Sequence, residues 1–190
     1  ILCETPLEVA AEVFIDASGD GWVAHQAGAT YRWGREGRDE FGESLAPETP
    51  DRCTLGSSIY FTARDVGKPV RFKAPSWART FTEEDLRLRS HHNPLNHILF
   101  WWMEYGGTLN VIDDADAIYR ELLAVVMGVW DHIKNAGDHG AETYVLDWIG
   151  KVPGRRESRR FVGDHIMTQS DIEDRVLFDD RVTYGGWWID

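Results

Sequence analysis

The feature that most constrains the fold is a long stripe of apolar residues with the 3.6-residue period of an α-helix. The stripe begins after Asp113 or Asp114, either of which can cap a helix, and Gly137 ends it. Its apolar positions are 115, 118, 122, 125, 126, 129 and 133. At 1.5 Å per residue the helix is roughly 30 Å long. A chain of 190 residues is long enough to bury a real core around such an element.

The rest of the chain reads mainly as strands and short helices. Runs rich in Val, Ile and aromatic residues, bounded by glycine turns, predict strands at 9–17, 29–33, 57–65, 69–72, 97–107, 143–150 and 159–166. Short helices are predicted at 22–27, after Thr82 with Asp85 at the capping-box position, and from a Ser170 cap to Arg175. Residues 34–55 read as a long surface loop. The predicted fold class is α+β, with a mixed, largely antiparallel sheet and one long helix.

Charge and cysteine content exclude several kinds of partner. The net charge of −12 argues against a nucleic acid or an anionic membrane, because both require a basic face. Cys3 and Cys53 read as two reduced cysteines, which slightly favours a cytoplasmic location and supplies no zinc or iron–sulfur site. The spacing of His132 and His139 is a poor metal signature, so no metal site is predicted.

The stretch "VFIDASGDGWVAHQAGA", residues 13–29, contains the dinucleotide-binding pattern G-x-G-x-x-A. Two features argue against a primary βαβ dinucleotide site. The predicted helix is too short for a crossover to a parallel strand, and Asp20 would repel a pyrophosphate. Its carboxylate is better suited to ribose or ribityl hydroxyls. The alternative is an ordinary strand-to-helix turn with Asp20 as the helix cap.

The same stretch resembles the second flavin-contacting motif, D-A-T-G-D-G, of glutathione-reductase-like FAD-dependent oxidoreductases. That family is related to the flavin domain of heterodisulfide-reductase-like proteins, and some members carry a putative xanthan lyase label. Further blocks resemble it in order: "WWMEYGG", "GVWDHIKNAGDHGAE", residues 146–172 and "YGGWWID". Ser18 replaces the usual threonine, and Trp188 stands where proline is common.

The resemblance implies an internal part of a two-domain FAD-binding oxidoreductase. In that family a Rossmann βαβ upstream holds the ADP half of FAD, and a further flavin-binding segment follows downstream. Residues 1–33 would border the FAD, with contacts from Ala17, Ser18, Gly19 and Asp20. Residues 34–190 would form a substrate-binding or capping domain. Some relatives hold iron–sulfur clusters, for which this chain has no cysteine cluster.

The basic segment "GRRESRR" supplies the first candidates for chemistry. Arg156 and Arg159 are candidate catalytic residues and Arg155 a candidate substrate ligand, because a guanidinium can bind a substrate carboxylate bidentately or stabilise charge on the flavin. On a strand, Arg159 would face away from Arg156 and Ser158. The alternative is a structural network of ion pairs.

Histidine and tryptophan supply the other candidates. His139 follows the helix-ending glycine, so it is predicted to lie on a loop and to act as an acid or base; His132 is a weaker candidate. Trp102 and Glu104 are candidate substrate-binding residues. Only one of Trp101 and Trp102 can line a given pocket, and core packing is the alternative for each tryptophan.

The predicted function is hydride transfer between FAD and a small or sugar-like substrate in the intact protein. The expected partners are that small-molecule or carbohydrate substrate and the remainder of the chain, and a homo-oligomer is compatible with the sequence. The alternative is a carbohydrate-binding or polysaccharide-lyase-like domain that stacks tryptophans on sugars. A third hypothesis is a scaffold that only docks to the remainder of its chain.

Overall fold

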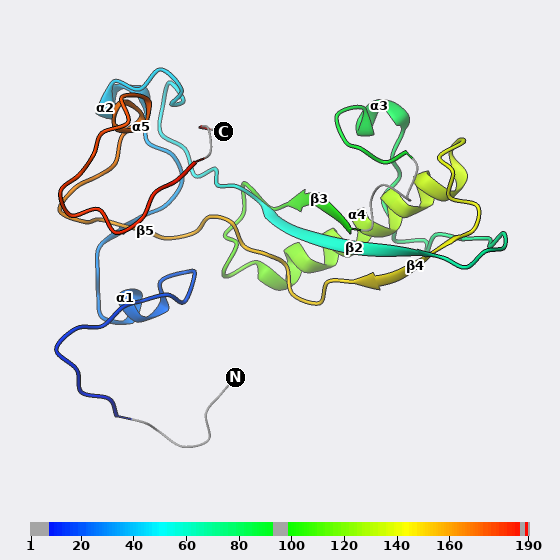
Figure 1. Cartoon of the computed structure of the whole chain (residues 1–190), viewed down its shortest axis with the longest axis horizontal. Helices are drawn as coiled ribbons and strands as arrows, with labels where there is room; N and C mark the ends of the chain where they lie inside the picture. Colours follow the sequence, from blue (N-terminus) through cyan, green and yellow to red (C-terminus); the bar gives the residue numbers. More distant parts are fainter. Residues whose placement is uncertain (1–7, 93–98, 187–188, 190) are drawn as a thin grey trace.

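The computed structural model describes residues 8–92, 99–186 and 189. Two lobes lie side by side along the longest axis (Figure 1). The sheet lobe contains the described residues between 56 and 150, and the loop lobe contains residues 8–55, 154–186 and 189. Two chain segments join them, one entering the first strand of the sheet lobe and one leaving its last strand (Figure 1).

The sheet lobe is built on three antiparallel strands in the order β3-β2-β4. They are β2 (Ser57–Asp65), β3 (Leu99–Tyr105) and β4 (Tyr144–Ile149). In the central strand Ile59 and Phe61 point into the core, while Tyr60 between them is exposed. This alternation follows from the two-residue period of a strand with one face buried.

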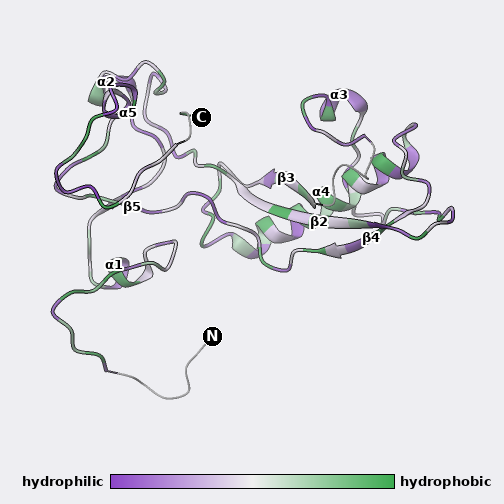
Figure 2. Ribbon diagram, in the orientation of Figure 1, coloured by the Kyte–Doolittle hydropathy of each residue, from purple (hydrophilic) through white to green (hydrophobic). Residues whose placement is uncertain are grey.

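The long helix α4 (Ala115–Asn135) packs against β2 and β3. Its buried side chains include Ile118, Leu122, Val126, Val129 and Ile133, which confirms the predicted stripe. Figure 2 shows hydrophobic and hydrophilic segments alternating along the helix, as an amphipathic element requires. The core of the lobe lies between this helix and the sheet.

Aromatic rings form the centre of that core. Phe61 stacks on Phe100 with 4.6 Å between ring centroids, and Trp130 of α4 meets Phe61 edge-on at 5.8 Å. The helix also passes very close to another segment, because a Cβ at Gly128 would lie 2.1 Å from the carbonyl oxygen of Arg79. That contact fixes residue 79 and the segment after it against α4.

The segment between β2 and β3 carries the one-turn helix α3 (Glu83–Leu86). The predicted capping box is confirmed: Thr82 accepts from the backbone N–H of Asp85, and the Asp85 carboxylate accepts from the backbone N–H of Thr82. The cap fixes the first residue of α3, Glu83, and therefore the position of its side chain.

The loop lobe has little regular structure. Its elements are α1 (Trp22–Gln26), β1 (Tyr31–Arg32), α2 (Arg38–Phe41), β5 (Arg160–Phe161) and α5 (Gln169–Glu173). The two short strands pair antiparallel. The cap of α5 is Thr168 with Asp171, so the Ser170 cap predicted from sequence was wrong. Thr168 takes that role because Asp171 stands three residues later and completes a capping box.

Four predicted strands differ from the structure, of which the one at 29–33 is reduced to Tyr31–Arg32. The strand at 9–17 is wrong: Val13 and Ile15 are 76% and 89% exposed, and no neighbouring strand among the described residues pairs with this segment. The strand at 69–72 is also wrong, and the one at 159–166 shrinks to two residues. Pattern alone cannot make a strand, because a strand needs a partner for its backbone hydrogen bonds.

The class itself, α+β with antiparallel sheets and one long helix, is confirmed. Among the described residues, no helix combines the length and the apolar character that crossing a bilayer requires. Cys3, Trp187 and Trp188 lie outside the described residues, and Cys53 is a free, half-buried cysteine.

Candidate functional site

The glycine turn is organised by the carboxylate of Asp16. One oxygen accepts from the backbone N–H of Ser18 at 3.0 Å and from its hydroxyl at 2.6 Å, and the other accepts from the N–H of Ala24 at 2.8 Å. These bonds lower the pKa of Asp16 to about 2, and the bond from the Ser18 hydroxyl has the largest effect. Asp16 therefore ties the turn to α1 as an anion at neutral pH.

Helix α1 begins directly on this turn. The backbone N–H of Trp22 donates to the Ser18 hydroxyl at 2.8 Å, so Ser18, and not Asp20, accepts from the first turn of the helix. Gly21 is left-handed with φ 65°, and a Cβ there would lie 2.0 Å from Phe161 of β5. Only glycine lets the start of α1 rest on β5.

The Asp20 side chain points into the protein and contacts the basic segment, residues 154–160. Its side chain is 10% exposed, forms an ion pair with Arg155 at 2.6 Å, and accepts from the Ser158 hydroxyl at 2.8 Å. Arg159 donates to the Asp20 backbone carbonyl at 3.0 Å. The fold thus brings together three predicted site residues, Asp20, Arg155 and Arg159, and Arg155 balances the charge of the carboxylate.

Arg159 differs from the other arginines of this segment in what surrounds its guanidinium. The group lies 4.8 Å from the centre of the Trp22 ring and 5.7 Å from that of Tyr31. Within the described chain no carboxylate pairs with it. Stacking on two aromatic faces orients a guanidinium while leaving in-plane N–H donors for a ligand.

A cleft of about 330 Å³ opens beside Arg159. Its remaining lining residues are His25, Tyr31, Trp33, Arg52, Asn110, Ile112 and Asp113. Two arginines, Arg52 and Arg159, and one acid, Asp113, line the cleft, and His25 adds an imidazole ring. A larger cleft of about 620 Å³ lies around α5 and contains none of the predicted site residues. Sequence reasoning missed His25, Arg52 and Asn110, which come from three distant segments.

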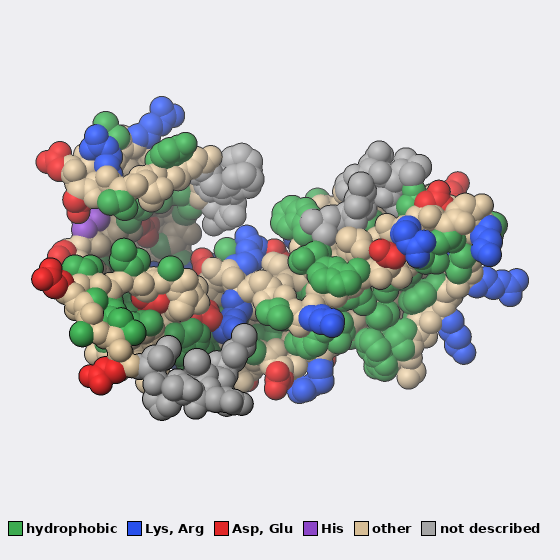
Figure 3. Space-filling model, turned by 60° about the horizontal axis from the view of Figure 1, so that its bottom comes forward, with side chains coloured by type: hydrophobic (Ala, Val, Ile, Leu, Met, Phe, Trp, Pro, Cys, Tyr) green, Lys and Arg blue, Asp and Glu red, His purple; other side chains and the backbone are tan. Residues whose placement is uncertain are grey.

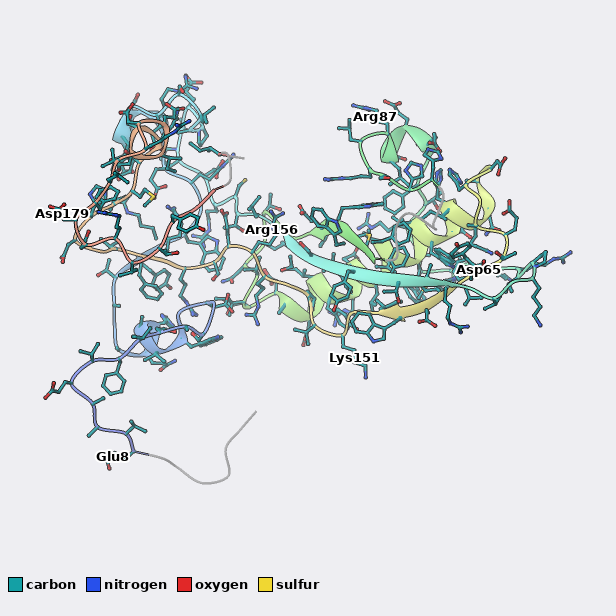
Figure 4. All side chains as sticks on the ribbon, in the orientation of Figure 1. Glu8, Asp65, Arg87, Lys151, Arg156 and Asp179 are labelled. Carbon is teal, nitrogen blue, oxygen red and sulfur yellow. The ribbon has the colours of Figure 1, made fainter. Side chains whose placement is uncertain are left out.

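Arg156 is held by an acid and not by the turn. It forms an ion pair with Glu104 of β3 at 2.5 Å, so a predicted catalytic residue and a predicted substrate-binding residue engage each other. Arg160 pairs with Glu36 at 2.9 Å. Arg156 lies at the junction of the two lobes (Figure 4), and Figure 3 shows Lys and Arg side chains at the waist between the lobes. Arg156 therefore forms a structural ion pair, which corresponds to the predicted alternative of an ion-pair network.

The expected alternation of faces along this segment does not occur. Regular strand geometry is limited to residues 160–161, so Arg155, Ser158 and Arg159 all reach the same residue, Asp20. At the start of the segment, Gly154 pairs with Ser58 of β2 through two backbone hydrogen bonds of 2.9 and 2.8 Å. This bridge positions the arginines at the entrance to the loop lobe.

His139 lies in the sheet lobe, away from the arginines, in a group that we call the imidazole cluster: Glu83, His91, His132 and His139. The Glu83 carboxylate is 3.1 Å from Nε2 of His91, 3.1 Å from Nε2 of His132 and 3.3 Å from Nε2 of His139. Glu83 lies in α3 and His132 near the C-terminal end of α4, whereas His91 and His139 lie in the segments that follow these helices (Figure 1). The exposed His92 also lies 3.1 Å from the Glu83 carboxylate. The structure therefore does not bring His139 together with Arg156 or Arg159.

The electrostatics of the cluster follow from burial and mutual contact. Burial lowers the pKa of His139, the hydrogen bond with Glu83 opposes this change, and the electrostatic influence of His132 and His92 acts in the same direction as burial. Burial alone would raise the pKa of Glu83, but hydrogen bonds from His91, His139 and His132 lower it to about 2. The cluster thus pairs a carboxylate with a neutral His139. Sequence reasoning missed Glu83 and His91, because no local spacing links residues 83 and 91 to 132 and 139.

Some of the described tryptophans pack within the protein, whereas Trp77 and Trp101 are 55% and 61% exposed and line neither of the two clefts. The indole N–H of Trp102 donates to the backbone oxygen of Ser90 at 3.2 Å, and its ring is half-buried against the core. Trp130 is fully buried, and Trp148 lies beside Tyr60 on the sheet at 4.9 Å. Trp22 lies against Arg159. These positions do not favour the alternative of a carbohydrate-stacking platform.

The turn fits one edge of a flavin site. Residues Ala17, Ser18 and Gly19 are exposed, and no atom lies within 4 Å of a Cβ built on Gly19. A flat ring system can therefore approach the backbone closely here, and the inward pairing of Asp20 removes an unpaired negative charge from the approach.

The comparisons with known proteins identify the family of the chain. A family model described as FAD dependent oxidoreductase matches residues 3–190. No curated protein and no solved structure gave a significant match. FAD is the cofactor of that family. Because the model spans nearly the whole sequence, the chain belongs to the FAD-dependent oxidoreductases.

Proposed function

We propose that this chain supplies the substrate-facing part of an FAD-dependent oxidoreductase. In this proposal residues 1–33 border the flavin through Ala17, Ser18 and Gly19, with Asp20 bracing the turn from inside. Residues 34–190 bind and cover the substrate. The family match and the exposed turn beside a cleft lined by two arginines support this division.

One observation carries the proposal: Arg159 is fixed by two rings and a carbonyl, and not by an acid. Arg156 and Arg160 are each neutralised by a glutamate, so they have less charge to offer a ligand. In the cleft, Arg159 and Arg52 would bind the anionic group of a small substrate, such as a carboxylate. The substrate carbon next to that group would then face the turn.

The chemistry is a two-electron oxidation or its reverse. In the oxidative direction the substrate would give up a hydride from a C–H bond together with the proton of the neighbouring O–H or N–H. FAD, when bound, supplies the two-electron acceptor. His25 lines the same cleft, and its ring contacts Tyr31 edge-on at 5.5 Å, so we propose His25 as the group that takes the proton. His139 has no place in this cleft.

The test uses the intact protein purified with its flavin. We expect flavin absorption, and bleaching of that absorption when an oxidisable carboxylate-bearing substrate is added without oxygen. Arg159→Ala should lower kcat/KM for an anionic substrate about 100-fold, mainly through KM, and Arg159→Lys should restore part of the loss. Arg71→Ala, which changes an exposed arginine of the sheet lobe, is the matched control.

Two outcomes would contradict the proposal. An intact, folded protein without flavin would remove its basis. A flavoprotein whose KM for the anionic substrate is unchanged by the Arg159→Ala substitution would show that another group binds the anion. We also expect the 190-residue chain alone to bind FAD weakly, because the described residues contain no phosphate-binding βαβ. Titration of that chain with FAD, followed by Trp fluorescence, measures this.

A further inference from the structure

The imidazole cluster lies outside the flavin-facing region and is not explained by the proposed function. One ligand atom from each of Glu83, His91, His132 and His139 can be chosen so that all four lie within 4.8 Å of one another. We propose that these four residues bind one zinc ion through three imidazole Nε2 atoms and one carboxylate oxygen.

Burial makes this group unlike a surface cluster of polar residues. The side chains of His91, His132 and His139 are only 2%, 2% and 3% exposed, while Glu83 is 58% exposed and closes the open side. The ring centroids of the three histidines lie 4.9 to 5.2 Å apart. Three buried imidazoles directed at one carboxylate are costly to assemble unless something between them holds them together.

The hydrogen bonds on the far side of two rings determine which nitrogen is free. Nδ1 of His91 lies 2.6 Å from the carbonyl oxygen of Arg89, and Nδ1 of His132 lies 3.1 Å from that of Phe81. A carbonyl oxygen only accepts, so each Nδ1 must carry the hydrogen. In the neutral ring Nε2 then has a lone pair. Backbone carbonyls fix the tautomer of metal-binding histidines in this way.

Without a metal ion, neutral rings with their hydrogen on Nδ1 would repel the carboxylate, and a ring can donate a hydrogen bond to Glu83 only after it takes up a proton on Nε2. The Nε2 lone pairs of His91 and His132 each face a carboxylate oxygen of Glu83 at 3.1 Å. His139 has a buried Nδ1 without a hydrogen-bond partner in the described structure, and its Nε2 also faces Glu83. A divalent cation between these atoms would form a coordinate bond with each of them, and the repulsion between their lone pairs would be offset.

The donor set indicates which cation fits. Three imidazoles and one carboxylate match the nitrogen-rich tetrahedral sites of Zn²⁺, whereas Mg²⁺ and Ca²⁺ prefer oxygen ligands. In a tetrahedron with bonds of about 2.1 Å the ligand atoms are about 3.4 Å apart. The distances from Oε2 of Glu83 to Nε2 of His132 and His139, 3.1 and 3.3 Å, already match, while Nε2 of His91 lies 3.1 Å from the other oxygen, Oε1. The widest pair, within 4.8 Å, needs to close by at most about 1.4 Å.

Four protein ligands leave no open position, so the ion is structural and not catalytic. His132 belongs to α4, His139 follows that helix, and Glu83 and His91 belong to the segment around α3. The ion would therefore fasten the segment of residues 81–92 to the end of α4. It would hold in place a part of the chain that has a single short helix of its own.

The test measures zinc in tag-free intact protein. We expect about one zinc per chain by mass spectrometry of metals, and Co²⁺ in its place should give the visible absorption of a tetrahedral site. A chelator should lower Tm, and added zinc should restore it. The flavin spectrum should not change, so failure of this proposal and failure of the proposed function can be told apart.

The variants identify the ligands. Glu83→Gln and His91→Ala should each weaken zinc binding at least about 100-fold and abolish the effect of the chelator on Tm. His165→Ala, which changes an exposed histidine of the loop lobe, should bind zinc like the wild type. Glu83 is exposed, so Glu83→Gln should fold even if variants of the buried histidines do not. The proposal is overturned if the metal-free protein neither takes up zinc nor gains stability from it. Wild-type zinc affinity in both Glu83→Gln and His91→Ala would overturn it equally.

Discussion

Different interactions stabilise the interior of each lobe. The sheet lobe has a continuous apolar core in which Phe61, Phe100 and Trp130 are at most 1% exposed. In the loop lobe the described residues contribute none to the buried hydrophobic core. Hydrogen bonds and ion pairs, such as those of Asp16 and Asp20, connect its segments.

This contrast separates the part that provides stability from the part that provides chemistry. Apolar burial is non-directional and strong, so it stabilises a lobe without requiring exact geometry. Ion pairs and caps are weaker but directional, and they place the turn, Arg155 and Arg159 relative to one another. The proposed flavin-facing residues belong to the second kind of region. Changes in the two lobes should therefore differ in size and in kind.

The largest effect is expected from the core of the sheet lobe. Phe61→Ala removes a fully buried ring that contacts both Phe100 and Trp130, and it should lower the free energy of unfolding by about 3–5 kcal/mol. Denaturant titration measures the change. Tyr60→Ala, next in sequence but 41% exposed, should cost at most about 1.5 kcal/mol. Equal losses in the two variants would contradict the burial assigned to this strand.

The second test uses the close contact of α4 with residue 79. Alanine normally stabilises a helix relative to glycine by about 1 kcal/mol. At Gly128 the new methyl group would meet the Arg79 carbonyl at 2.1 Å, so Gly128→Ala should instead destabilise by about 1–3 kcal/mol. Thermal unfolding gives the sign directly, and a rise in Tm would show that the two segments are not in contact.

The third test compares one ion pair from each lobe. Asp20→Asn breaks a pair whose carboxylate is 10% exposed and leaves Arg155 without its acid, so a loss of about 1–3 kcal/mol is expected. Asp147→Asn breaks a pair with Arg64 whose side chains are 43% and 61% exposed, and at most about 1 kcal/mol should be lost. Hydrogen exchange at the amides of α1 should rise only in the first variant.

The smallest effect on stability is expected from lowering the pH. The Ser18 and Ala24 hydrogen bonds lower the pKa of Asp16 from 3.8 to about 2, and Arg35 first of all lowers that of Asp51 to about 2. Because the folded-state pKa is the lower one, this stabilisation is present above pH 3.8 and is lost as the pH falls through about 2. Trp22 emission should therefore change between about pH 4 and 2. In Asp16→Asn the part due to Asp16 should disappear; an unchanged profile would contradict its role.

The sheet lobe was the more predictable one from sequence. The limits of β2 are those predicted, and the stripe of α4 and the cap of α3 are confirmed, because each depends on a local pattern. The strand predicted at 9–17 was wrong for the opposite reason. Val13 and Ile15 have the composition of a strand, but no described segment supplies the neighbour that a strand requires.

The site was predicted only where its residues are close in sequence. Asp20 and the arginines were singled out separately, and the fold joins two of them, Arg155 and Arg159, to Asp20 across more than 130 residues. Their roles in binding remain predictions. The imidazole cluster could not be found in this way, since Glu83 and His139 come from different segments and share no motif. A family resemblance gave the cofactor, whereas packing decides which side chains meet.

Gly21 has a consequence for how this protein can vary. The start of α1 touches Phe161 at a point where even a methyl group does not fit, although 140 positions separate the two residues. Any larger residue at 21 would push the helix off the strand that follows the basic segment, and the geometry between loop and guanidinium would be lost with it. In saturation mutagenesis under selection for turnover, position 21 should tolerate no replacement, and a smaller partner at 161 should be the first compensating change to emerge.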